Sequence, residues 1–81
     1  MQRPSSKRDD SKELEALGLA IRAVRKEQGL SQEALADQAG IDRSHMGRIE
    51  RGERNVTILN VLRVSNALSF KLSELFKRAE L

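Results

Sequence analysis

Apolar residues recur along most of this chain at the spacing of α-helices. In the first such segment they are separated by three, four and three positions and so share one helix face: Leu14, Leu17, Ile21 and Val24. Ser11 is a suitable N-cap before this segment, and Gly29 can end the helix after it. We therefore predict a helix from about Lys12 to Gln28.

The stretch from Ser31 to Gly52 predicts two short helices joined by a tight turn. Ser31 is the expected N-cap of the first helix, and Gly40 is expected to end it in the left-handed conformation. Asp42 then caps the second helix, which ends at Gly52. The residues expected to face inward are Leu35, Ala36, Ala39, Met46 and Ile49. Because Ala36 is small, the two helices can cross closely there, as in a helix-turn-helix.

Two further helices are predicted after this pair. Thr57 is a good N-cap for the first of them. Its expected inward residues are Ile58, Val61, Leu62, Ser65 and Leu68, and the residues expected outside that face are Leu59 and Val64. The last helix is expected to begin near Leu72. Since no segment shows the alternation of a β-strand, we predict an all-α fold in which five short helices surround one small core.

Length and composition indicate a single domain. The chain has 81 residues, and residues 1–10 are polar and charged without periodicity. We therefore expect a disordered arm over residues 1–10 and one domain over residues 11–81. The sequence contains no Cys, which excludes disulfides and is compatible with the reducing cytoplasm, where we expect the protein. No apolar run is long enough to span a membrane, and the N-terminus lacks the apolar segment of a signal peptide.

Few residues suited to catalysis are present. The sequence has one His and lacks Cys, Tyr and Trp, so a nucleophile with a base and an orienting group has no candidate. His45 and Asp42 are three residues apart on a predicted helix, where such a pair is usually a surface contact. One His and scattered carboxylates do not make a metal site, and no Gly-rich phosphate loop follows a strand. We therefore expect neither an enzyme nor a bound cofactor or metal.

Positive charge is concentrated in the second half of the Ser31–Gly52 stretch and just beyond it. The net charge of the chain is only +3, but residues 43–54 contain four Arg against two Glu. A basic edge on one face is typical of proteins that bind a polyanion. A merely solvated charged surface is the alternative.

Residues 14–78 resemble the phage-repressor (Cro/CI, or XRE) family of helix-turn-helix DNA-binding domains. The resemblance rests on Gln32, Leu35, Ala36, Gly40 and Ile41 together with the phrase Arg48-Ile49-Glu50-Arg51-Gly52. It implies a lambda-repressor-like fold with the helix-turn-helix at the second and third helices. It also implies an ion pair between Arg25 and Glu50 that ties the first helix to the third; two independent surface charges are the alternative. Lys71 departs from the family, which usually has Ser or Asp at that cap, so we expect a weaker start of the last helix.

A helix-turn-helix implies that its second helix, here from about Arg43 to Arg51, lies in the major groove of double-stranded DNA. Arg43 is the first candidate for base readout, because a guanidinium can donate two hydrogen bonds to guanine. The other candidate base contacts are Ser44 and Arg48. The candidates for either a base or a backbone contact are His45, Gly47 and Arg51. For His45, an exposed side chain without a contact is the alternative.

Phosphate contacts are expected at two helix starts, where free N–H groups and the helix dipole favour an anion. The residues concerned are Ser31 and Gln32 at one start and Arg54, Asn55 and Thr57 at the other. In the family, these two starts flank the recognition helix and hold the DNA backbone on either side. For Gln32 the alternative is an ordinary exposed polar residue.

One domain of this size makes too few base contacts to select a site in a genome, so we expect a homodimer on a palindromic operator. The candidate interface residues are Leu59, Phe70, Leu72, Phe76 and Leu81, and closing the small core is the alternative for them. Within the family, Asp42-Arg43-Ser44 and Arg54-Asn55 resemble the controller proteins of restriction–modification systems. That likeness implies a transcriptional regulator of its own promoter, with RNA polymerase as a candidate partner.

Two other functions are compatible with this pattern. A protein-interaction module with the same fold, such as an antitoxin, would need an added segment to wrap its partner, and only the charged residues 1–10 are available. A nonspecific basic binder would need Lys and Arg on several faces, whereas acidic residues are interspersed outside residues 43–51.

Overall fold

The computed structural model describes residues 11–81, which form five α-helices. They are α1 (Lys12–Glu27), α2 (Gln32–Ala39), α3 (Arg43–Glu50), α4 (Ile58–Ala67) and α5 (Leu72–Arg78). The predicted all-α, five-helix fold is therefore confirmed, with the helix-turn-helix at α2 and α3. The predicted arm, residues 1–10, lies outside the described residues.

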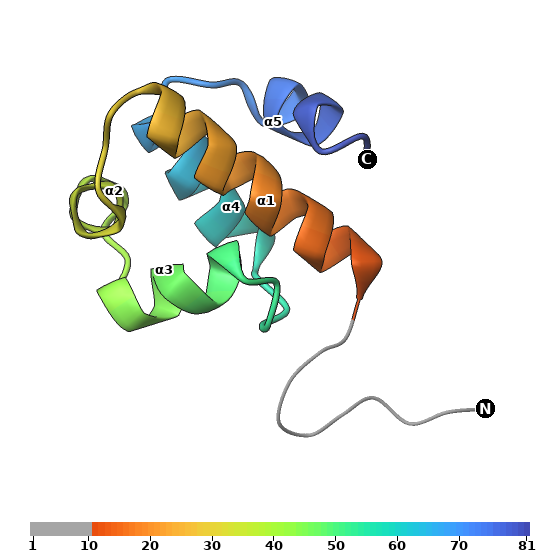
Figure 1. Cartoon of the computed structure of the whole chain (residues 1–81), viewed down its shortest axis with the longest axis horizontal. Coiled ribbons are helices and arrows are strands. Elements are labelled where there is room, and N and C mark those ends of the chain that lie inside the picture. The colour runs from red at the N-terminus through yellow and green to blue at the C-terminus, as the bar shows by residue number, and fades with distance from the viewer. Residues whose placement is uncertain (1–10) are drawn as a thin grey trace.

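The longest helix, α1, organises the arrangement. It packs against α3 on one side and against α5 on the other (Figure 1). The helix α2 packs against α3 and α4, and α4 also packs against α5. In Figure 1, α3 lies at the margin of the molecule on the side of α1 opposite α5. One long face of α3 is therefore not covered by another helix of residues 11–81.

Capping side chains set where the first four helices begin. In each, a side-chain oxygen of the N-cap residue accepts a backbone N–H two or three positions on, and these caps are Ser11, Ser31, Asp42 and Thr57. At the start of α5 the Lys71 ammonium carries only donors and cannot accept a backbone N–H, so its side chain makes no such bond. Instead, the Glu74 carboxylate accepts the backbone N–H of Lys71 at 3.1 Å. The last helix thus has only one half of a capping box.

The core takes apolar side chains from every helix and from the α2–α3 turn. Its buried members are Leu17, Ala20, Ile21, Val24, Leu35, Ala36, Ala39, Ile41, Met46, Ile49, Val61, Val64, Leu68, Leu75 and Ala79. The inward faces predicted for α2 and α3 match this core. The face predicted for α1 matches it except at Leu14, which is half-buried and lies outside the core.

The prediction for α4 was wrong at three positions. Val64, expected outside, is fully buried, whereas Ile58 and Leu62, expected inside, are 60% and 39% exposed. At about 100° per residue, Val64 lies only about 40° from Leu68 and about 60° from Val61, whereas Leu62 lies about 100° from Val61. The apolar positions of α4 extend around most of the helix, so their spacing alone does not show which part faces the core.

Candidate nucleic-acid interface

A tight turn holds α3 across α2. Gly40 has a φ of 69°, a left-handed conformation that favours glycine. The N–H of Gly40 donates to Asp37 at 3.2 Å, and the N–H of Ile41 donates to Ala36 at 2.9 Å. Both Ala36 and Ile41 are buried, so the turn itself is part of the core. The orientation of α3 relative to α2 is therefore fixed by packing as well as by hydrogen bonds.

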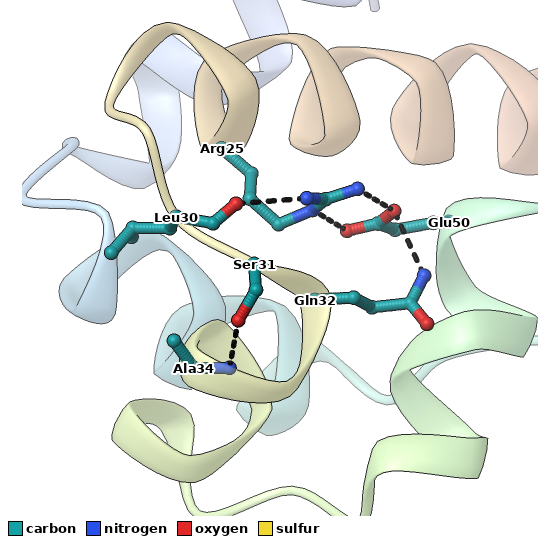
Figure 2. A network of polar contacts seen from close by, with 6 residues as sticks. All are labelled: Arg25, Leu30, Ser31, Gln32, Ala34 and Glu50. Atoms are coloured by element: carbon teal, nitrogen blue, oxygen red, sulfur yellow. Dashed lines mark hydrogen bonds and ion pairs between the residues drawn. The ribbon is translucent and has the colours of Figure 1, made fainter.

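A buried ion pair joins α1 to the end of α3. Arg25 donates from Nε to Glu50 Oε2 at 2.7 Å and from Nη2 to Glu50 Oε1 at 3.0 Å (Figure 2). The side chains of Arg25 and Glu50 are only 10% and 3% exposed. The third nitrogen of the guanidinium, Nη1, donates to the carbonyl oxygen of Leu30 at 2.9 Å. Arg25 therefore links α1, the α1–α2 connection and α3 through one planar group.

Gln32, the first residue of α2, extends this network. Its Nε2 donates to Glu50 Oε1 at 3.1 Å, which Figure 2 shows beside the Arg25 contact. Gln32 is half-buried and hydrogen-bonded, so it is not an ordinary exposed polar residue. The Ser31 hydroxyl at the same helix start accepts the N–H of Ala34 at 3.0 Å. The two residues predicted to contact phosphate here also hold the start of α2 in place.

The uncovered face of α3 carries most of the predicted base contacts. Arg43 and Ser44 are exposed, and His45 and Arg48 are half-buried. Arg43 Nε lies 4.0 Å from Glu33 Oε2, and because both side chains are mostly exposed this pair is weak. The N-terminal end of α3 is thus the part most open to a ligand.

Gly47 is not on the open surface where the sequence pattern placed it. It is buried. A Cβ atom at this position would lie 3.1 Å from Arg51 Nη1 and 3.4 Å from Gln32 Oε1. The flexible ends of these two longer side chains extend over the glycine. Arg51 is four residues on, so helical spacing indicates its contact, but the contact of Gln32 comes from α2 and cannot be read from spacing along one helix.

Arg51 is held by an acidic neighbour. Its Nε donates to Glu53 Oε2 at 2.7 Å, and its Nη2 lies 3.5 Å from Glu53 Oε1. The hydrogen bond that it donates to Glu53 raises the pKa of the Arg51 guanidinium above its usual value. Arg51 therefore remains charged, and a phosphate would have to compete with Glu53 for it.

The second predicted phosphate site lies at the start of α4. Arg54 and Asn55 are exposed and precede the helix. The Thr57 hydroxyl is the N-cap and accepts the N–H of Asn60 at 3.1 Å. These residues belong to the connection that leaves the C-terminal end of α3.

A surface hollow of about 240 Å³ lies beside the first of these sites, between α1, α2 and the end of α3. Its lining residues are Arg22, Arg25, Gln32, Glu50 and Arg51. Sequence reasoning missed Arg22, although its position three residues before Arg25 places both on neighbouring parts of α1. Arg22 is exposed and adds a positive charge close to Gln32.

The predicted dimer residues fall into two groups. Phe70, Leu72 and Phe76 are partly buried and pack against the core, as the alternative interpretation required. Leu59 and Leu81 are 63% and 53% exposed. The exposed apolar surface of α4 also includes Ile58 and Leu62, which had been expected inside.

Other kinds of site find no support in the described part of the chain. Within residues 11–81, no three His, Cys, Asp or Glu side chains come together in a way that could hold a metal ion. None of the helices there combines the length and apolarity that crossing a membrane requires.

This chain belongs to the helix-turn-helix family, whose model matches residues 21–75. Among its relatives, control protein C.MunI from Mycoplasma sp is 42% identical over 64 residues, which cover 78% of this chain and 86% of the relative. Control protein C.SmaI from Serratia marcescens is 38% identical over 64 residues, which cover 79% and 76%. The crystal structure of the restriction-modification controller protein C.AhdI from Aeromonas hydrophila superposes with a TM-score of 0.79 at 44% identity. The match covers 82% of this chain and all of that one (100%).

Proposed function

We propose that this protein is a sequence-specific transcriptional regulator that binds a palindromic double-stranded DNA operator as a homodimer in the cytoplasm. The observation that carries the proposal is the uncovered N-terminal end of α3, where Arg43 and Ser44 are exposed on a helix fixed by the buried Arg25–Glu50 pair. A helix held rigidly at one end and open at the other is suited to entering a major groove. The likeness to control proteins supports a regulatory role, and we propose that the protein exerts it on its own promoter.

The DNA backbone would be held on both sides of α3. On one side, Gln32 and the first amides of α2 face a phosphate, and Arg22 and Arg51 add positive charge. On the other side, the start of α4 contributes Arg54 and Thr57. These contacts would fix the register of α3 on the duplex, and the exposed residues of α3 would then select the bases. If the regulator activates transcription, RNA polymerase is the second partner.

The homodimer would use the exposed apolar surface of α4. Ile58, Leu59 and Leu62 are large apolar residues that a single chain leaves open to solvent. Because a palindromic operator has twofold symmetry, a dimer with the same surface on both chains would place two α3 helices about one DNA turn apart.

Fluorescence anisotropy tests the proposed function directly. A labelled duplex from the region upstream of the protein's own gene is titrated beside a scrambled duplex at one salt concentration. We expect tighter, cooperative binding to the native duplex. Equal and weak binding to both duplexes, falling steeply with salt, would leave only electrostatic attachment and contradict the proposal.

A further inference from the structure

The Asp42 carboxylate holds Ser44 through both its backbone and its side chain. Oδ2 of Asp42 accepts the N–H of Ser44 at 3.1 Å and also receives the Ser44 hydroxyl. The N–H of His45 lies 3.4 Å from the same oxygen. An ionised carboxylate has acceptors only, so the hydrogen in the contact between the two side chains belongs to Ser44.

The carboxylate is ionised under ordinary conditions. The Ser44 hydroxyl, followed by the N–H of His45, holds the pKa of Asp42 below its usual value. Asp42 is also exposed. It therefore stays charged at neutral pH and does not offer a proton to Ser44.

In this geometry the Ser44 oxygen can only accept a hydrogen bond from a ligand. A hydroxyl has one hydrogen and two lone pairs, and the hydrogen is directed at Asp42. Only acceptor positions remain for a ligand. In the major groove the exocyclic amino groups of adenine and cytosine donate, whereas guanine O6 and N7 and thymine O4 accept. Phosphate oxygens accept as well, so they are poor partners for a Ser44 in this state.

We propose that Asp42 fixes Ser44 as an acceptor that selects a base with an exocyclic amino group, adenine or cytosine, at one position of each half-site. The proposal rests on the proposed function, because it requires α3 to lie in a major groove. Arg43, the neighbouring residue, has donors only and selects the opposite kind of base edge. Asp42 is a positioning residue, since it acts through Ser44.

The test begins with sites that the wild-type protein selects from random duplexes. Kd is then measured by anisotropy for the selected duplex, for each single base-pair change, and for duplexes in which one adenine or cytosine is replaced by an analogue without the amino group. At one position per half-site, we expect loss of the amino group to weaken wild-type binding about two- to tenfold. Ser44→Ala is expected to show no further loss with the analogue, because the partner of the amino group is already gone.

Two variants of Asp42 separate positioning from helix capping. Asp42→Gly removes the acceptor at little cost to the cap, which frees the Ser44 hydroxyl to donate. We expect this variant to accept guanine or thymine at the same position. Asp42→Asn keeps an oxygen that can accept both the N–H groups and the hydroxyl, so it is expected to retain the preference. Circular dichroism of each variant shows that the fold is intact.

Three results would overturn the proposal. Equal weakening of all duplexes by Ser44→Ala would identify Ser44 as a phosphate contact. An unchanged base preference in Asp42→Gly would show that Asp42 does not set the polarity of Ser44. A wild-type protein that selects no sequence at all overturns the proposed function together with this inference, whereas the first two results leave specific DNA binding intact.

Discussion

Gly18 of α1 lies directly against the carbonyl oxygen of Glu50 at the end of α3. A Cβ atom at position 18 would be 2.4 Å from that oxygen and 2.6 Å from the carbonyl oxygen of Ile49. Both oxygens belong to the backbone, which cannot swing aside as a flexible side chain can. Since Gly18 and Arg25 are two turns apart on the same side of α1, this close approach helps Arg25 to reach Glu50.

The substitution Gly18→Ala tests the close packing of α1 against α3, because the packing decides whether the substitution raises or lowers stability. Helix propensity alone predicts a gain of about 1 kcal/mol, because Gly is unfavourable inside a helix. The clash with α3 predicts a loss of about 1–3 kcal/mol, since the two helices must move apart. We expect the loss to dominate and the free energy of unfolding, measured by urea titration, to fall. A rise would contradict close backbone packing at this crossing.

Removing one partner of the Arg25–Glu50 pair should be strongly destabilising. Arg25→Met leaves the Glu50 carboxylate, 3% exposed, without its main partner in the core. Loss of one member of a buried pair costs about 3–5 kcal/mol. We expect a loss of that size in the free energy of unfolding, measured by chemical denaturation.

The double variant Arg25→Met/Glu50→Leu is the matched control for the buried pair. It replaces both charges with apolar groups, and such replacements are often neutral or nearly so. We therefore expect the double variant to be more stable than Arg25→Met. If the stability losses of Arg25→Met and Glu50→Leu add up to the loss of the double variant, the two charges do not interact.

The fold could be predicted from the sequence where the spacing of apolar and capping residues was compatible with only one arrangement. The stripe of α1, the caps at Ser11, Ser31, Asp42 and Thr57, and the helix-turn-helix all follow from local spacing. The inward face of α4 could not be predicted in this way, because Ile58, Leu62 and Val64 are all apolar and their burial depends on where α2 and α5 pack.

The candidate site was predictable in part, for a related reason. Arg43 and Ser44 are exposed as their helix positions imply, but the cover of Gly47 comes from Gln32 on another helix and from the long side chain of Arg51. Arg22 also becomes part of the site only because α1 and α2 meet at the hollow. The places of Gln32 over Gly47 and of Arg22 at the hollow depend on how separate helices pack, and the periodicity of one helix does not contain that information.

The exposed apolar surface of α4 predicts how the protein associates. Leu59→Glu places a charge on that surface, and we expect a shift from dimer to monomer in sedimentation equilibrium, because the charge would be buried on association. Leu19→Glu is the matched control, since Leu19 and Leu59 are both 63% exposed but Leu19 lies on α1. Equal self-association of the Leu59→Glu variant and the wild type would exclude this part of α4 from the interface.

Acid should weaken the start of α3. The pKa of Asp42 is lowered in the folded protein, chiefly by the Ser44 hydroxyl. A group with a depressed pKa stabilises the fold above its unfolded pKa, about 3.9 for Asp, and the contribution is lost as the pH falls through the lower folded value. We therefore expect the stability difference between wild type and Asp42→Asn to be constant near neutrality and to shrink below about pH 4. Thermal unfolding at a series of pH values measures this stability difference. A difference that grows as the pH falls would contradict the lowered pKa of Asp42.

Base readout by α3 and phosphate contact at the start of α2 can be separated with three variants. Arg43→Ala should weaken binding to the selected duplex by about 1–3 kcal/mol and relax the preference at one position per half-site. Arg43→Lys keeps the charge but cannot form the two parallel hydrogen bonds, so it should lose the preference while keeping its affinity for scrambled DNA and its salt dependence. Gln32→Ala, at the start of α2, should weaken selected and scrambled duplexes alike. If Arg43→Lys weakens both duplexes equally, or if the loss in Gln32→Ala is confined to the selected duplex, the roles assigned to these two residues are wrong.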